Sequence, residues 1–127
     1  MTLIARILIG LIALFFLVFA FRFYFMPEAI AAEFFVAPMG DAGLSTIRGD
    51  LGGAFFAIGT FALLGIRTGA AHWLHSAAAI IAAVAVGRII GFVLDGVAPT
   101  ALVAFTVEVV FVVVLVFGGR ILRSAVR

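Results

Sequence analysis

Four long, continuously apolar stretches alternate with short polar segments along the chain. These stretches predict helices at about residues 7–26, 49–66, 73–95 and 98–119. Each is close to the roughly 20 residues that a helix needs to cross about 30 Å of hydrocarbon. Strands of a lipid-facing barrel alternate apolar and polar residues instead, so helices are the better interpretation. We therefore predict an all-α fold, a transmembrane four-helix bundle that forms a single membrane domain over residues 1–127.

The first connection, on the side of the membrane that we expect to be outer, is the longest. Pro27 suits the first turn of a helix, and Ile30 and Phe34 share one helix face. This pattern predicts a short interfacial helix over residues 28–36 that lies on the membrane surface. Pro38 and the glycines that follow it then predict a loop. An irregular linker explains the whole connection about equally well, so both interpretations stay open.

Composition supports a membrane location. The chain is 67% hydrophobic and 11% charged, whereas soluble domains are about 45–50% apolar and about 25% charged. Membrane lipid is therefore the expected surrounding. The chain has no cysteine, which excludes disulfides and thiolate metal sites. Its net charge of +2 is too small and too scattered for a nucleic-acid surface, so we expect no nucleic-acid partner.

The charges also predict an orientation. On one side of a four-span topology lie five arginines, Arg6, Arg67, Arg120, Arg123 and Arg127. On the opposite side lie four carboxylates, Glu28, Glu33, Asp41 and Asp95, with only two arginines, Arg22 and Arg48. Because positive residues tend to stay cytoplasmic, we predict that both termini are cytoplasmic. The bias toward Ala, Gly, Val and Arg, with no Lys, suits a GC-rich bacterial genome. A signal peptide over residues 1–31 is disfavoured, because its apolar run is too long.

Two ionisable residues lie at membrane depth. Glu108 is near the middle of the fourth helix, and Arg88 is in the outer half of the third. Each such residue costs about 2.5–3.5 kcal/mol at a helix centre, so it usually faces the bundle interior and a partner. Folding the chain about Val97 brings the two residues to an offset of about 3 Å, within the reach of an arginine. We predict an ion pair between Arg88 and Glu108.

Four further charges are expected near this pair. We predict one internally neutral polar network, structural or ligand-binding, formed by Arg22, Arg48, Asp50, Arg88, Asp95 and Glu108. Glycines beside these charges are expected to let the helices pack closely: Gly49, Gly52, Gly53, Gly87 and Gly91. Either the network only fixes the helix orientations, or it lines a polar pocket that opens outward. The sequence does not decide between these interpretations.

The sequence gives little support for a metal site or a catalytic site. His72 and His75 lie three residues apart at the start of the third helix, but no cytoplasmic carboxylate or cysteine completes a metal shell. No serine has a base at the spacing of a catalytic triad, and no phosphate-binding loop is present. We therefore expect no metal, no cofactor and no catalytic residue, and no enzyme activity.

Three motifs carry a family resemblance. They are Arg48-Gly-Asp-Leu-Gly-Gly53, then Gly87-Arg88-Ile-Ile-Gly91 followed by Asp95-Gly96 and Pro99, and finally Glu108. Together they resemble a family of small bacterial four-helix membrane proteins known as a domain of unknown function. The architecture is similar to that of DoxX-like membrane proteins. The resemblance covers nearly the whole chain and implies an inner-membrane protein, but it implies no established reaction.

Three functions fit these observations. We favour a protein that binds a small amphiphile, such as a lipid or quinone, or that serves as an accessory or assembly subunit of a larger membrane complex. The first alternative is a proton- or ion-coupled carrier, motivated by Glu108. Four helices are few for alternating access, so a carrier would need to be a homo-oligomer. The second alternative is a subunit of a membrane redox enzyme.

Overall fold

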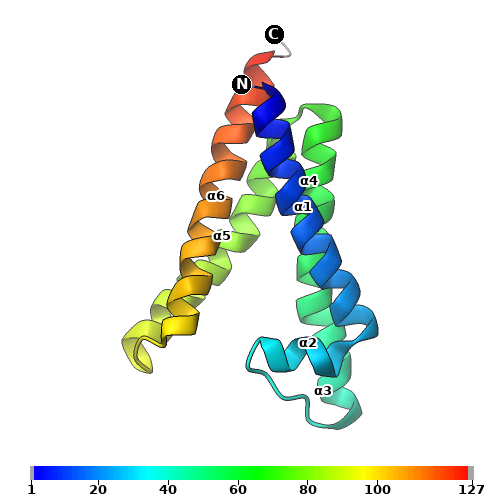
Figure 1. Ribbon diagram of the computed structural model, residues 1–127, viewed down its shortest axis with the longest axis vertical. Coiled ribbons are helices and arrows are strands. Elements are labelled where there is room, and N and C mark those ends of the chain that lie inside the picture. Colours follow the sequence, from blue (N-terminus) through cyan, green and yellow to red (C-terminus); the bar gives the residue numbers. More distant parts are fainter. Residues whose placement is uncertain (1, 126–127) are drawn as a thin grey trace.

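A computed structural model of the protein describes residues 2–125, and all of the secondary-structure elements in this range are helices (Figure 1). The elements in chain order are α1 (Thr2–Phe25), α2 (Pro27–Glu33), α3 (Gly40–Thr46), the π-helix η1 (Ile47–Gly52), α4 (Gly53–Thr68), α5 (Ala71–Leu94) and α6 (Pro99–Ala125). No break separates α3, η1 and α4, which form one helix over Gly40–Thr68.

Four helices are long and apolar enough to cross a membrane: α1, Gly40–Thr68, α5 and Pro99–Ser124. The predicted all-α bundle is therefore confirmed, and the chain is a multi-pass membrane protein. Three helices extend five or more residues beyond the apolar pattern, and the second span begins at Gly40 instead of residue 49. α1 begins at Thr2, and α6 continues through Arg120 and Arg123. Loss of apolar character marks where hydrocarbon ends, whereas a helix continues for as long as its backbone stays hydrogen-bonded.

The two ends of the bundle differ. α1 begins and α6 ends at one end, beside the link between α4 and α5, and we name this the terminal end (Figure 1). The opposite end carries α2, α3 and the turn at residues 95–98, and we name it the loop end. The cytoplasmic location of the terminal end stays a prediction. Arg127, one of the five arginines behind it, lies outside the described residues.

All four spans share one core in the terminal half. Its buried members include Ile9 and Phe16 of α1, Ile58 of α4, Leu74 of α5 and Leu115 of α6. Three glycines permit this close packing. A Cβ added to Gly59 would lie 2.6 Å from Leu17, one on Gly65 would lie 2.3 Å from Leu74, and one on Gly118 would lie 2.7 Å from Ile9.

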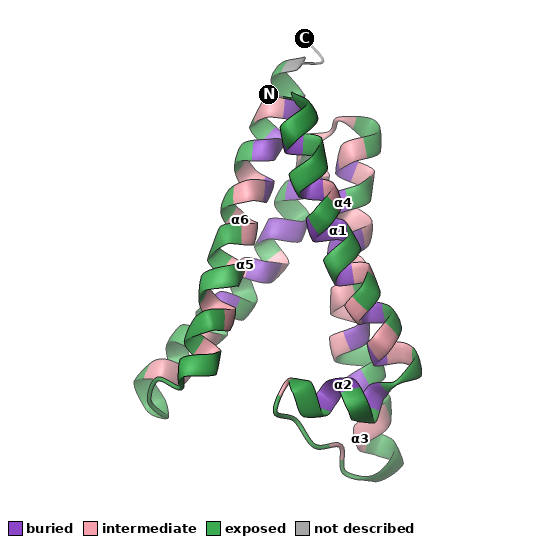
Figure 2. Ribbon diagram, viewed as in Figure 1, coloured by how far each residue is buried: buried purple, intermediate pink, exposed green. Residues whose placement is uncertain are grey.

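The helices separate into two pairs toward the loop end. α1 and α4 stay together there, covered by α2, and bury Phe23, Ile30 and Ile47 in a second core (Figure 2). The α5–α6 hairpin diverges from them (Figure 1), and none of the described residues from 86 to 114 is buried. An aromatic layer lies where the pairs part. The ring of Phe111 is 5.4 Å from that of Phe15 and 5.6 Å from that of Phe16, measured between centroids.

The first connection is more ordered than predicted. The expected short helix is present as α2, although it ends at Glu33 instead of residue 36, and its position on the membrane surface stays a prediction. Phe35 follows in the left-handed region with φ of 58° and stops the helix. The predicted loop after Pro38 is wrong, because α3 forms there. Gly40 has a φ of 61°, which favours glycine, and Asp41 places a carboxylate in the first turn, where the helix dipole stabilises it.

Candidate functional site

The predicted ion pair between Arg88 and Glu108 is present. The Nε–H of Arg88 donates to both carboxylate oxygens of Glu108, at 2.8 Å to Oε1 and 2.9 Å to Oε2. The two side chains are 28% and 14% exposed, respectively. The pair therefore links α5 to α6 at a partly covered position.

The turn between the helices sets the register of this pair. Gly96 has a φ of 94°, a conformation that glycine adopts without strain. Pro99 then occupies the start of α6, where its missing N–H costs nothing. Counting back from Leu94, Arg88 lies about 9 Å inside the end of its helix, and Glu108 lies about 14 Å inside the start of its own. The site is therefore at membrane depth.

Both residues continue the inward stripe of their helix. Arg88 follows the buried Ile81 and Ala85 on one face of α5. Glu108 lies seven residues before Leu115, which is fully buried in the core. In the terminal half, the inward faces of α5 and α6 pack against α1 and α4. Toward the loop end, where the hairpin has diverged from α1 and α4, the same faces carry the ion pair (Figure 2).

Arg88 keeps unused hydrogen-bond donors. An arginine side chain has five N–H donors, four of them on Nη1 and Nη2. Within residues 2–125, both hydrogen bonds of Arg88 come from Nε, and its Nη groups donate none. Hydrocarbon provides no acceptor. These donors therefore need an oxygen from outside the described chain: that of a water, a lipid, a ligand or a partner.

Arg22 forms a second ion pair. Its Nη1 donates to Oε2 of Glu33 at 3.0 Å, and its Nη2 donates to Oε1 of the same carboxylate. These hydrogen bonds fix α2 against the loop end of α1 and lower the pKa of the Glu33 carboxyl. Arg22 therefore does not join the shared network predicted from the sequence. It pairs with Glu33 because α2 folds back over the end of α1.

Arg48 acts on the backbone. Its Nε–H donates to the carbonyl oxygen of Tyr24 at 2.9 Å. Tyr24 belongs to the last turn of α1, whose carbonyls have no partner within the helix. Asp50, two residues further along η1, is exposed and forms no ion pair in the described chain. Arg48 therefore caps α1 and pairs with no carboxylate within residues 2–125.

The structure does not bring the six charged residues into one network. Of this set, only Arg88 and Glu108 pair with each other within residues 2–125. Asp95 is exposed beside the α5–α6 turn. The physical reason is the divergence of the two helix pairs, which separates the η1 end of one pair from the turn of the other (Figure 1).

The predicted glycine contacts are found at one position of five. A Cβ on Gly52 would lie 2.9 Å from the ring of Tyr24, so Gly52 does permit close packing of η1 on α1. Added Cβ atoms on Gly49, Gly53 and Gly87 would meet nothing within 4 Å, and one on Gly91 would reach only Asp95, at 4.0 Å.

The closest contacts fall instead on glycines outside the predicted set: Gly59, Gly65 and Gly118. Their signal in the sequence is their position within long apolar helices. Glycine costs about 1 kcal/mol relative to alanine in a helix interior, so its presence there indicates a close approach.

Metal ligands are not grouped in the described chain. His72 and His75 are both exposed at the start of α5. Within residues 2–125, no three side chains of His, Cys, Asp or Glu lie together as a potential metal site. The candidate site is therefore the Arg88–Glu108 pair with its unused Arg88 donors.

Comparison with known proteins agrees with the motif resemblance. No curated protein and no solved structure matches the chain. A family model described as a domain of unknown function (DUF4345) matches residues 4–118. That range includes both residues of the ion pair, the Arg48 motif and most of all four spans. The chain therefore belongs to the DUF4345 family.

Proposed function

We propose that this membrane protein binds a small amphiphile at the Arg88–Glu108 pair. The observation that carries the proposal is the set of Nη donors on Arg88, which have no acceptor within residues 2–125 although they lie at membrane depth. A donor without an acceptor is costly in hydrocarbon. An oxygen atom on a bound amphiphile supplies the missing acceptor.

The charge balance favours an uncharged acceptor. Glu108 already neutralises Arg88, so an anionic ligand would leave a net negative charge inside the bundle. An isolated charge in a low-dielectric surrounding is expensive. A carbonyl oxygen, such as that of an ester lipid or a quinone, accepts from the Nη groups and leaves the site neutral.

Aromatic side chains flank the pair along the hairpin. Toward the loop end, the rings of Phe92 and Phe105 pack against each other with centroids 5.7 Å apart. Toward the terminal end, Phe111 lies one turn after Glu108 and contacts Phe15. These rings provide apolar surface on both sides of the polar centre, as the two parts of an amphiphile require.

Ligand retention by matched lysine variants tests the proposal. We would purify the full chain in mild detergent and identify bound small molecules by native mass spectrometry and lipid extraction. Arg88→Lys keeps a positive charge beside Glu108 but removes the planar pair of Nη groups, so it should lose a carbonyl amphiphile that the wild type retains.

Arg120→Lys is the control, because Arg120 is exposed at the terminal end, away from the pair. It should retain the amphiphile. Equal retention by Arg88→Lys and wild type would contradict the proposal, and so would wild-type protein that carries no small molecule. Stoichiometric copurification of another membrane protein would favour the accessory-subunit function. The carrier and redox alternatives stay predictions from the sequence.

A further inference from the structure

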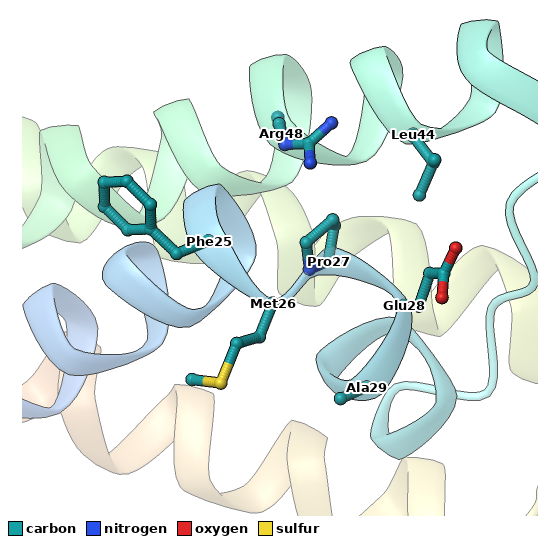
Figure 3. Close-up of a pocket in the computed structure, with 7 residues that line it drawn as sticks. All are labelled: Phe25, Met26, Pro27, Glu28, Ala29, Leu44 and Arg48. Atoms are coloured by element: carbon teal, nitrogen blue, oxygen red, sulfur yellow. The ribbon is translucent and has the colours of Figure 1, made fainter.

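A second polar site lies at the loop end, separate from the Arg88–Glu108 pair. It is a pocket of about 280 Å³ where α1 ends and α2 begins (Figure 3). Its apolar lining includes Phe25, Met26, Pro27 and Leu44, and its charged lining is Glu28 and Arg48. This volume is slightly below that of pockets for drug-sized ligands, so the pocket fits a headgroup and not a whole lipid.

Arg48 is positioned for an external anion. Its Nε–H is held by the carbonyl of Tyr24 at 2.9 Å, which fixes the plane of the guanidinium beside the pocket (Figure 3). Its Nη1 and Nη2 make no hydrogen bond within residues 2–125. Two parallel Nη donors match the oxygens of a phosphate. Arg48 therefore provides a ready-made phosphate contact.

Glu28 supplies the opposite charge in the same pocket. Figure 3 shows Arg48 and Leu44 extending from the α3–η1 helix, while Glu28 extends from the start of α2 on the facing side. Glu28 and Arg48 form no ion pair with each other, and Glu28 has no ion-pair partner elsewhere in residues 2–125. Two opposite charges that share a pocket without meeting are complementary to a ligand that carries both charges.

We propose that this pocket binds a zwitterionic phosphodiester headgroup of the phosphoethanolamine type. The phosphate accepts from the Nη groups of Arg48, and the ammonium donates to the carboxylate of Glu28. A primary ammonium suits this site because it donates hydrogen bonds to a carboxylate, whereas a quaternary ammonium is best recognised by an aromatic cage. Phe25 is the one aromatic residue in the lining.

The same chemistry has two sources, a membrane lipid and a free headgroup. Phe25 and Met26 are 67% and 47% exposed at the end of a membrane span, where they offer apolar surface to the acyl chains of a lipid. A purely anionic lipid would meet the charge of Glu28 without a compensating ammonium. The site should therefore discriminate between lipids by headgroup.

Lipid titration of the full chain tests this inference. Mixed micelles would contain phosphatidylethanolamine, phosphatidylglycerol or phosphatidylcholine, and native mass spectrometry would count the bound lipids. We expect wild-type protein to bind phosphatidylethanolamine roughly tenfold more tightly than phosphatidylglycerol, as one charge-assisted hydrogen bond implies. Glu28→Gln should abolish this preference, and Arg48→Gln should weaken the binding of both lipids.

Glu28→Gln is the decisive variant, because Glu28 is exposed and forms no side-chain hydrogen bond within residues 2–125. Asp41→Asn is its matched control, since Asp41 is an exposed acid outside the pocket, and it should keep the preference. Equal wild-type affinity for the three lipids would overturn the inference, as would an unchanged preference in Glu28→Gln.

Two further arms separate the sources and the sites. Displacement of the lipid by soluble glycerophosphoethanolamine would identify a free headgroup as the ligand, whereas binding of the lipid alone would identify the membrane. Arg88→Lys should leave the phosphatidylethanolamine preference unchanged. Failure of this inference is therefore distinguishable from failure of the proposed function at Arg88.

Discussion

Arg88 meets Glu108 through its Nε alone, with both carboxylate oxygens within 2.9 Å of that one nitrogen. This geometry divides the guanidinium into a part that links two helices and a part that is free to bind. The two parts make separable predictions, because a change at Glu108 removes the link while a change from arginine to lysine removes the planar pair of Nη groups.

Neutralising one member of the pair should destabilise the protein more than neutralising both. Arg88→Gln leaves Glu108 charged and unpaired at membrane depth, and Glu108→Gln leaves Arg88 charged and unpaired there. Each should lower the free energy of unfolding by about 2–3 kcal/mol, the insertion cost of one uncompensated charge. The double variant should lose less than either single variant, because it leaves no uncompensated charge. Detergent-based unfolding of the four proteins measures the coupling, and strict additivity would show that the pair contributes nothing.

Gly65 should tolerate no side chain. A Cβ there would lie 2.3 Å from Cδ2 of Leu74, which is fully buried, so Gly65→Ala should cost about 1–3 kcal/mol through overpacking. Gly87→Ala is the matched control, because nothing lies within 4 Å of its Cβ position. It should change stability by no more than about 0.5 kcal/mol or stabilise slightly. Thermal unfolding in detergent that ranked the two variants equally would contradict the packing described for α4 and α5.

Acid should release α2 from α1. Hydrogen bonds from Arg22 lower the pKa of Glu33 from its ordinary value of 4.5. The stabilisation is therefore fully present above pH 4.5 and is lost as the pH falls through the lowered pKa. The chain has no cysteine, so a spin label on Ala32→Cys is unique.

The mobility of this spin label should rise below pH 4.5, where Glu33 begins to be protonated. In a Glu33→Gln background the label should be mobile already at neutral pH, where the ion pair cannot form. A label equally immobile in both backgrounds at neutral pH would show that the ion pair does not hold α2.

Single cysteines also test the orientation. Asp41 is exposed at the loop end, and Thr68 and Ser124 are exposed at the terminal end. If the terminal end is cytoplasmic, an impermeant maleimide added to intact cells should label Asp41→Cys and neither of the other two variants. Labelling of Thr68→Cys and Ser124→Cys instead would reverse the predicted topology while leaving the four spans intact.

The sequence predicts contacts well where the chain itself fixes the register. Arg88 and Glu108 flank a tight turn, so counting residues along two antiparallel helices is enough to pair them. Arg22 and Glu33 pair through the path of α2, which depends on how Phe23 and Ile30 pack in the second core. Such packing is not readable from hydropathy alone.

Arg48 illustrates a second limit of sequence patterns. It donates to the backbone of Tyr24, and a carbonyl oxygen has no residue type that a pattern could reveal. The sequence also does not reveal the π-helix η1 that carries Arg48. The extra residue per turn of a π-helix shifts the side chains without changing the composition. A prediction that pairs every charged side chain with an opposite charge therefore overestimates the number of ion pairs.

The absence of buried residues from 86 to 114 has a mechanical consequence. The α5–α6 hairpin packs against the other spans in the terminal half, so a tilt of the rest of the hairpin would have the ring of Phe111 as its pivot. Pro99 lies about 18 Å from that pivot, so a tilt of about 10° displaces the tip by about 3 Å with every backbone hydrogen bond intact. A span can tilt at modest cost to match the thickness of the bilayer, so such a tilt would change how far Arg88 stands from the opposite pair of helices.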